Sequence, residues 1–271
     1  MKKVLTIAGS DSSGGAGIQA DLKTFAAHGV FGMSVIVSVV AENTSTVLDL
    51  LDVTPYMVEK QIDAVFTDIE VDAVKIGMLS SSACMKAAAG RLWRYMPRNV
   101  VVDPVMLAKN GSPLMAPGAM DTLIKEILPY AGLLTPNIHE AQRISGLAIT
   151  DVSGMEKAAE RIRNMGCENV LVKGGHIEGD AVDVLYDGQE FFHFTEKRID
   201  TKNTHGTGCT YSSAIAANLA LGLALPIAVR QAKKYVTDAI AHAPDIGKGN
   251  GPTNHFYRLY QYGLEKGLKY D

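Results

Sequence analysis

The chain has 271 residues, of which 47% are hydrophobic and 20% are charged, and its formal net charge is −3 at pH 7. This composition is typical of a globular protein with a substantial core and excludes a disordered chain. Because basic residues do not cluster, the chain lacks the positive field that attracts nucleic acids or membrane surfaces, so we expect small-molecule partners.

Short apolar runs rich in β-branched residues alternate with segments of helical spacing along most of the chain. The predicted strands are Val4–Ile7, Val35–Val40, Ala73–Ile76, Val100–Val102, Leu133–Leu134 and Val170–Val172. The predicted helices between them are Ala16–His28, Pro55–Thr67, Ser80–Tyr95, Ala119–Leu128, Ile138–Ser145 and Ser153–Met165. This alternation predicts a doubly wound α/β fold, with a mostly parallel central sheet and helices on both faces.

The pattern changes after Lys173. Two strands, Ala181–Tyr186 and Phe191–Thr195, are joined through an Asp-Gly turn and predict a hairpin at one end of the sheet. Two helices, Gly208–Leu221 and Pro226–Ala243, then close the fold. Since the chain has no low-complexity linker and no internal repeat, we expect residues 1–271 to form a single domain.

The cysteines and the apolar stretches indicate the cellular compartment of the protein. Cys84, Cys167 and Cys209 are scattered without the spacing of a zinc site or a disulfide framework, which fits a reducing compartment. The longest apolar stretch, residues 213–225, is shorter than the roughly 20 residues that span a bilayer. We therefore expect a cytoplasmic protein that does not cross a membrane.

Residues 204–210, with the sequence THGTGCT, form a glycine-rich turn that leads directly into a helix of small residues. Gly206 and Gly208 let backbone N–H groups converge on an anion, and the helix adds the positive end of its dipole. The turn is therefore a candidate seat for a transferring phosphate. A turn that only caps a helix has the same sequence features, so the other motifs of the chain are needed to distinguish the two interpretations.

Ligands of parallel sheets bind at the carboxyl ends of the strands. The first strand is followed by a polar, glycine-rich loop, residues 9–17, which leads to Asp21, and we expect the Asp21 carboxylate to hydrogen-bond a ligand. The loop is not a P-loop, because no Gly-Lys-Ser/Thr follows at the required spacing. A plain strand-to-helix connection is the alternative interpretation.

Oxygen ligands follow two later strands. Asp103 comes directly after Val100–Val102, and Asn137 and Glu140 come after Leu133–Leu134, one helical turn apart. Mg²⁺ in phosphoryl transfer is usually held by one or two carboxylates plus phosphate, so Asp103 and Glu140 are the candidate metal ligands. A compatible alternative makes Asn137 a helix N-cap and Glu140 its capping-box partner.

Together these motifs resemble the hydroxymethylpyrimidine and phosphomethylpyrimidine kinases of thiamine biosynthesis, a family of the ribokinase-like superfamily. The matching stretches are AGSDSSGGAGIQAD at 8–21, VDPVM at 102–106, TPN at 135–137 with Glu140, KGGH at 173–176 and HGTGC at 205–209. The resemblance implies ATP-dependent, Mg²⁺-assisted phosphorylation of the pyrimidine's hydroxymethyl group and then of the resulting monophosphate. It also implies a homodimer.

The resemblance assigns roles within the turn and around it. Cys209 stands where ribokinase-like enzymes commonly carry an aspartate base, and a helix N-terminus with nearby cations is expected to lower the thiol pKa so that it accepts the alcohol's proton. Gly206 and Gly208 would hold the developing charge, with Lys109 as a phosphate partner. The expected nucleotide contacts are Asn137, Lys173, His205, Thr207 and Lys233. For His205, a turn-stabilising role is the alternative.

Substrate choice depends on Glu42. The family typically reads Ala-Gln-Asn-Thr where this chain reads Ala-Glu-Asn-Thr at 41–44. A glutamate accepts hydrogen bonds from an exocyclic amine and from a protonated ring nitrogen, but it cannot donate to an unprotonated one. We expect Glu42 to bind the aminopyrimidine by favouring a protonated ring nitrogen, with Gly9, Asp21, Met78 and Val105 as the other substrate contacts.

Three other functions remain open at this stage. A pyridoxal kinase of the same fold is the runner-up, because related enzymes with an apolar residue at the Glu42 position resemble pyridoxal kinases. A cysteine hydrolase using Cys209 with His205 would leave Asp103, Asn137 and Glu140 unexplained. A non-catalytic pyrimidine sensor would not need an intact glycine turn.

Overall fold

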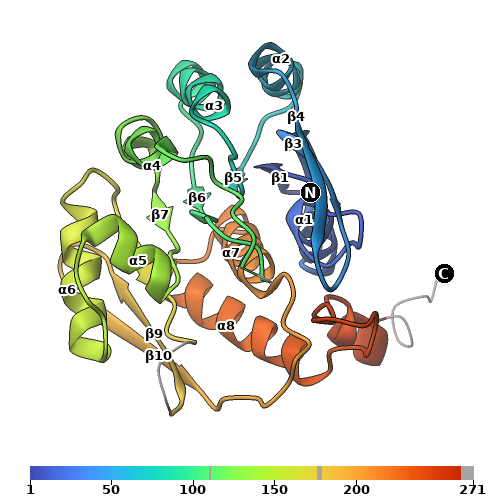
Figure 1. Ribbon diagram of the computed structural model, residues 1–271, viewed down its shortest axis with the longest axis vertical. Helices are drawn as coiled ribbons and strands as arrows, with labels where there is room; N and C mark the ends of the chain where they lie inside the picture. The colour runs from blue at the N-terminus through green and yellow to red at the C-terminus, as the bar shows by residue number, and fades with distance from the viewer. Residues whose placement is uncertain (110, 176–178, 264–271) are drawn as a thin grey trace.

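A central sheet with helices on both faces forms the body of the protein (Figure 1). The computed structural model describes residues 1–109, 111–175 and 179–263. Its large sheet has the strand order β10-β9-β8-β7-β6-β5-β1-β2. The strands are β1 (Lys3–Ala8), β2 (Phe31–Ile36), β5 (Ala73–Ile76), β6 (Val100–Val102), β7 (Leu133–Leu134), β8 (Val170–Val172), β9 (Ala181–Tyr186) and β10 (Phe191–Glu196). The predicted doubly wound, mostly parallel fold is confirmed.

In this sheet the neighbouring strands of the series β8-β7-β6-β5-β1-β2 pair in parallel. At the other edge, β9 pairs antiparallel with β8, and β10 pairs antiparallel with β9. Every residue of β5, β6, β7 and β8 is buried, as expected for parallel strands covered by helices on both faces. The predicted hairpin after Lys173 is therefore present as β9 and β10.

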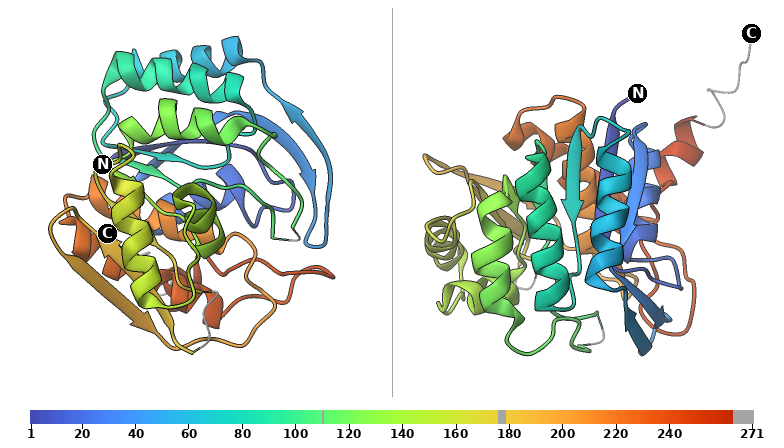
Figure 2. Two further views of the ribbon diagram at one scale, coloured as in Figure 1. Left: turned by 60° about the vertical axis from the view of Figure 1, so that its left-hand side comes forward. Right: turned by 90° about the horizontal axis from the view of Figure 1, so that it is seen from above.

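The helices divide between the two faces of the sheet (Figure 2, left). One face packs against α2 (Pro55–Phe66), α3 (Ser82–Tyr95), α4 (Ala119–Thr122), α5 (Ile138–Ser145) and α6 (Val152–Arg163), and the other against α1 (Gly17–Ala27), α7 (Thr207–Ala220) and α8 (Leu225–Ala241). Polar caps fix several helix starts: Thr54 caps α2, Ser81 caps α3 and Asp151 caps α6. Among the described helices, none combines the length and apolarity needed to cross a membrane.

The segment predicted as one helix from Ala119 to Leu128 is divided in the structure. Helix α4 ends at Thr122 and continues as a π-helical turn, η1 (Leu123–Ile127), and a 3₁₀ turn, η2 (Leu128–Tyr130). Pro129 has no N–H to donate to an earlier carbonyl, so the α-helical hydrogen-bond ladder cannot continue through it.

The predicted strand Val35–Val40 is also two elements. Strand β2 ends at Ile36, and β3 (Ser38–Glu42) pairs antiparallel with β4 (Val47–Asp52) in a separate two-stranded sheet. The Val37 N–H donates to the Ala8 carbonyl at 3.0 Å, so the chain turns across the end of β1 before leaving the main sheet. The β3–β4 hairpin therefore stands beside the carboxyl end of β1, where it carries Glu42 (Figure 1).

Candidate active site

A cavity of about 550 Å³ lies at the carboxyl ends of the parallel strands. Residues that follow β1, β5, β6, β7 and β8 line it, and the turn before α7 and the β3–β4 hairpin contribute further walls. This is the position at which open α/β sheets bind ligands. The topology thus brings together segments that are separated by more than half of the chain.

Most residues predicted for the site line this one cavity. They are Gly9, Glu42, Met78, Asp103, Val105, Lys109, Asn137, Glu140, Lys173, His205, Gly206, Thr207, Gly208, Cys209 and Lys233. Asn110 and His176, which belong to motifs singled out in the sequence, lie outside the described residues.

Asp21 is the exception, because it does not line the cavity and its side chain is fully buried. The Lys75 ammonium donates to both Asp21 carboxylate oxygens at 2.9 Å, and the hydroxyls of Thr6 and Ser213 donate at 2.6 and 2.7 Å. Protein donors therefore occupy both oxygens. The expected ligand contact is corrected to a structural ion pair that joins α1, β5 and α7.

The glycine turn begins α7 in a conformation that requires glycine. Gly206 has a φ of 75°, and a Cβ on it would overlap the carbonyl oxygen of Gly15 in the first glycine loop. The Thr207 N–H donates to the Thr204 carbonyl at 3.3 Å, whereas the N–H groups of Gly208 and Cys209 have no intrahelical partner, as in the first turn of any α-helix. Since these residues line the cavity, the helix start presents an anion-binding end to it.

Asp103 and Lys173 form an ion pair directly opposite this helix start. The Lys173 ammonium donates to Asp103 Oδ1 at 2.7 Å, and the Thr135 hydroxyl donates to the same oxygen at 3.0 Å. A Cβ on Gly208 would lie 3.2 Å from Asp103 Oδ2 and 3.4 Å from Lys173 Nζ. Burial opposes the charge of Lys173, but the carboxylates of Asp103 and Glu140 outweigh it and raise the Lys173 pKa. The ammonium therefore stays charged beside the anion seat.

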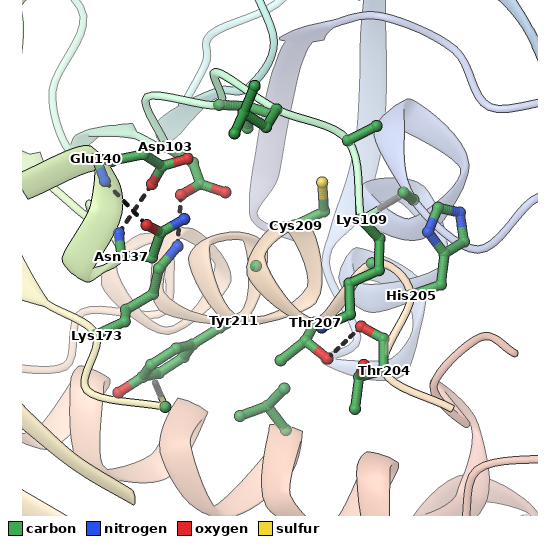
Figure 3. Close-up of a pocket in the computed structure, with 18 of the residues that line it drawn as sticks. Asp103, Lys109, Asn137, Glu140, Lys173, Thr204, His205, Thr207, Cys209 and Tyr211 are labelled. Atoms are coloured by element: carbon green, nitrogen blue, oxygen red, sulfur yellow. Dashed lines mark hydrogen bonds and ion pairs between the residues drawn. The ribbon is translucent and has the colours of Figure 1, made fainter. Parts of the chain in front are cut away.

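Asn137 and Glu140 form the capping box of α5, as one interpretation of the sequence predicted. Asn137 Oδ1 accepts from the Glu140 N–H at 3.0 Å, and Glu140 Oε2 accepts from the Asn137 N–H at 2.8 Å. Burial, and then the charge of Asp103, raises the Glu140 pKa to about 7 against the opposing charge of Lys173. Figure 3 shows both side chains grouped with Asp103 and Lys173 on one side of the cavity.

This acidic group suits a hard cation. Among the residues that the structure describes, the hydrogen bonds to Asp103 use Oδ1, which leaves Oδ2 facing the glycine turn. Carboxylate oxygens are the ligands that Mg²⁺ prefers, and Asp103 and Glu140 both supply them. Burial is the main cause of the raised Glu140 pKa, and repulsion by the Asp103 charge adds to it. A divalent ion at this point would relieve that repulsion.

Cys209 lies between the acidic group on one side and Lys109 and His205 on the other (Figure 3). Burial raises the pKa of its thiol to about 11, and although the Lys75 charge and the Gly17 N–H oppose burial, the net shift is upward. The expected lowering of the pKa by the helix N-terminus and nearby cations is therefore not what the structure gives. At neutral pH the ligand-free protein holds a protonated thiol here.

His205 connects the two glycine loops. Its Nε2 lies 2.8 Å from Asp11 Oδ2, and its backbone N–H donates to the Gly251 carbonyl at 3.0 Å, as a turn-stabilising histidine would. Burial lowers the His205 pKa, but the hydrogen bond and the charge of Asp11 raise it by more than burial lowers it, so the net shift is upward. Sequence reasoning left Asp11 without a role, because its partner lies 194 residues away.

The opposite half of the cavity is lined by α8, from which only Lys233 was predicted, and by the segment after β10, to which the sequence analysis gave no role. Val236, Ile240 and Ile199 give this half an apolar wall. Lys233 does not point freely into it, because its ammonium donates to Asp183 Oδ2 at 2.7 Å, while Asp183 Oδ1 accepts from the Gly174 N–H at 2.9 Å. Lys233 thus fixes the loop that follows β8.

Fold and site together define an enzyme that transfers phosphoryl groups: an anion-binding helix start faces acidic oxygens and a lysine in a strand-end cavity. Residues 11–254 match the family model described as phosphomethylpyrimidine kinase. The chain belongs to that family.

Known relatives agree with this assignment. A hydroxymethylpyrimidine/phosphomethylpyrimidine kinase of Rhizobium meliloti is 50% identical over 95% of this chain and 98% of its own length. The thiamine biosynthesis bifunctional protein ThiED of Geobacter sulfurreducens is 52% identical over 93% of this chain, which spans 52% of that longer protein. An ADP complex of Bacillus subtilis pyridoxal kinase superposes with a TM-score of 0.89 at 38% identity, over 96% of this chain and 99% of that one.

Proposed function

We propose that the protein is an ATP-dependent kinase that phosphorylates 4-amino-5-hydroxymethyl-2-methylpyrimidine and then its monophosphate, two steps of thiamine biosynthesis. The observation that carries this proposal is the helix start at Gly206–Cys209, which lies beside the Asp103–Lys173 pair at the wall of a cavity of about 550 Å³. The family to which the chain belongs, and the kinase activity named for its full-length relatives, support the pyrimidine as acceptor.

The acceptor pocket is formed by Gly9, Glu42, Met78 and Val105. Met78 is buried, and a Cβ on Gly9 would come within 2.5 Å of Met78 Cε, so the missing side chain at position 9 leaves room for Met78 beside the substrate ring. Glu42 supplies the polar contact at the ring edge. The hydroxymethyl group then points toward Cys209 at the helix start.

The phosphate is bound by backbone amides and ammonium groups. The N–H groups at Gly206–Cys209 receive the developing negative charge, while Lys173 and Lys109 approach the phosphate oxygens from the two sides of the cavity (Figure 3). Asp103 and Glu140 would hold Mg²⁺, which when bound supplies neutralisation of phosphate charge. Asn137 and Thr207 complete the nucleotide side, with the apolar wall of α8 beneath the base. Of the other two predicted nucleotide contacts, His205 is held by Asp11 and Lys233 by Asp183, so they act through the loops that they fix.

Cys209 orients the alcohol rather than removing its proton at the outset. A thiol with a pKa of about 11 is protonated at neutral pH, so it hydrogen-bonds to the hydroxyl without carrying charge. The transition state of phosphoryl transfer is loose in most analyses, with little proton transfer needed before the new O–P bond forms. Positioning by the helix start therefore accounts for more of the catalysis than base strength does.

Pyridoxal kinase is the second candidate. The similarity of fold to the Bacillus subtilis enzyme favours it, because the two chains superpose over nearly their whole length. Glu42 disfavours it: an amino group beside a ring nitrogen offers the donor that a carboxyl group accepts, and the edge of a hydroxypyridine offers a different pattern.

The products made from ATP and the pyrimidine alcohol test this proposal. Phosphorus NMR and mass spectrometry should show a pyrimidine monophosphate that accumulates first and is then consumed as the diphosphate appears. A Lys173→Met variant, which removes the ammonium beside Asp103, should slow both steps. ATP consumption without a phosphorylated pyrimidine would contradict the proposal.

We further propose that the chain acts in the cytoplasm as a homodimer. Its three cysteines are free, which suits a reducing compartment. Val39, Leu48 and Leu51 are exposed on the β3–β4 hairpin and offer an apolar surface for a second copy. Light scattering coupled to gel filtration would reveal a monomer if this surface does not pair.

A further inference from the structure

Asp11 is buried, and protein groups hydrogen-bond to both oxygens of its carboxylate. Its Oδ1 accepts from the N–H and the hydroxyl of Ser13 at 2.7 Å each. Its Oδ2 accepts from the N–H groups of Gly15 and Ala16 at 2.9 and 2.7 Å and lies 2.8 Å from His205 Nε2. Burial raises its pKa, but these hydrogen bonds outweigh burial and hold the pKa far below its usual value. Asp11 is therefore a fixed negative charge.

Glu42 is held next to this charge. The Ser12 hydroxyl donates to the Glu42 carbonyl at 2.7 Å and accepts from the Glu42 N–H at 3.0 Å, so the loop that contains Asp11 also anchors the end of β3. One carboxyl oxygen from each of Asp11 and Glu42 and one ring nitrogen of His205 lie within 4.8 Å of one another. Glu42 lines the cavity, and among the described residues no hydrogen bond from an N–H group to its carboxyl is present.

A shared cation is a poor explanation of this group, because five donors already occupy the Asp11 carboxylate. A proton resolves the repulsion between the two carboxyls more simply. Burial, and then the charge of Asp11, raises the Glu42 pKa to about 7, with His205 opposing. Lys109 is the further charged group on this side, and it acts on His205.

We propose that Glu42 recognises the amino edge of the pyrimidine as a neutral carboxylic acid, with Asp11 as the positioning residue that keeps the proton on Glu42. An amino group beside a ring nitrogen presents a donor next to an acceptor. A carboxylic acid presents the complementary acceptor and donor, whereas a carboxylate presents only acceptors. This inference rests on the proposed function, because it concerns the pyrimidine subsite of that reaction.

One proton is therefore part of the bound complex, whether it resides on Glu42 or on the ring nitrogen that it bridges. Above the pH at which Glu42 ionises in the free protein, binding of the pyrimidine must take up that proton. The dissociation constant should then rise about tenfold per pH unit above pH 7. Binding of ATP, on the other side of the cavity, should not share this dependence.

Isothermal titration of the full chain with the pyrimidine alcohol, from pH 6 to pH 9 in two buffers of different ionisation enthalpy, tests the proposal. The wild-type protein should bind more weakly as the pH rises and take up about one proton per pyrimidine bound at pH 8. Glu42→Gln supplies the same donor and acceptor without titrating, so its binding should be independent of pH and release or take up no proton.

Asp11→Asn separates the positioning role from a structural one. Without the Asp11 charge, Glu42 ionises at a lower pH, so proton uptake should already appear at pH 6. The double variant Asp11→Asn with Glu42→Gln should recover pH-independent binding. Wild-type binding that does not vary with pH, or a pH dependence that persists in Glu42→Gln, would overturn the proposal.

Infrared spectroscopy of the ligand-free protein gives a readout that does not depend on substrate or on the folding of Asp11→Asn. The wild-type protein should show protonated carboxyl absorption at pH 6 that fades between pH 6 and pH 8. Because the pKa of Glu140 is also raised to about 7, part of this absorption remains in Glu42→Gln, and the band of Glu42 is the difference between the two spectra. Identical carboxyl absorption in the two proteins would overturn the proposal. A protein with the band that binds no pyrimidine at any pH would instead contradict the proposed function.

Discussion

Gly206 packs so closely against Gly15 that a side chain at position 206 would overlap the Gly15 carbonyl oxygen. The contact joins the glycine loop after β1 to the glycine turn before α7, which lie almost 200 residues apart in the chain. It places the amides of the helix start at the mouth of the acceptor pocket. The two loops are therefore packed together as one unit, and a substitution in either loop should lower both the stability of the protein and its catalytic rate.

Gly206→Ala tests this contact. The positive φ alone should cost about 1–3 kcal/mol of stability, and relief of the overlap must move the helix start, so kcat should also fall steeply. Gly222→Ala is the matched control, because Gly222 has a φ of 92° but open space around its Cα. The control should lose stability and keep its kcat. A Gly206→Ala enzyme with wild-type kcat would show that the amide positions are unimportant.

The buried pair of Asp21 and Lys75 should be essential to stability and not to substrate affinity. Asp21→Asn leaves the Lys75 ammonium without its counter-ion in the core and should destabilise the protein by about 3–5 kcal/mol. Urea unfolding should show a smaller loss for Asp21→Asn combined with Lys75→Met, since no uncompensated charge remains. A large rise in KM for the pyrimidine in folded Asp21→Asn would restore Asp21 as a ligand contact.

Asn137 is predicted to combine a structural role with a nucleotide contact, and two substitutions separate them. Asn137→Ala removes the N-cap of α5 and should cost about 0.5–2 kcal/mol, whereas Asn137→Ser keeps a capping oxygen and should unfold at nearly the wild-type urea concentration. Both variants lack the side-chain amide and should raise the KM for ATP. If Asn137→Ser matches the wild-type KM, Asn137 serves only as a cap.

The thiol of Cys209 should react slowly at neutral pH. With a pKa of about 11, its thiolate fraction at pH 7 is on the order of a hundredfold below that of an ordinary cysteine. Alkylation by iodoacetamide, located by mass spectrometry and compared with Cys209→Ala, should accelerate about tenfold per pH unit from pH 7 toward pH 11.

The raised pKa of Cys209 also predicts how kcat depends on pH. If Cys209 orients the alcohol as a neutral thiol, kcat should stay level between pH 7 and pH 9. A kcat that climbs tenfold per pH unit over that range would instead indicate a thiolate base, and rapid alkylation at pH 7 would contradict the raised pKa itself.

The sheet and the composition of the cavity follow from sequence because they depend on local patterns. Fully apolar strands ended by Asp103, Asn137 or Lys173 predict both a parallel sheet and the edge at which those residues meet. The β3–β4 hairpin was missed for a local reason as well: Val35–Val40 is apolar except for Ser38, and the turn of the chain at Val37 divides it.

Long-range pairing could not be predicted in the same way. Asp21 follows a glycine loop, as a ligand-binding carboxylate would, and its partner Lys75 stands 54 residues away within an apolar strand. The Cys209 pKa likewise depends on how the folded chain surrounds this partly buried thiol. Asp11 has no signal of its own within a run of serines and glycines, and its importance appears only when His205 and Glu42 are brought beside it.

The relative kcat/KM for two acceptor alcohols tests the central claim most directly. With saturating ATP and Mg²⁺ and a single protein preparation, the aminopyrimidine alcohol should be preferred over pyridoxal by about tenfold or more, since a site built to hydrogen-bond one ring edge rejects another that lacks the matching groups. An equal or greater kcat/KM for pyridoxal would contradict the account and make the protein a pyridoxal kinase.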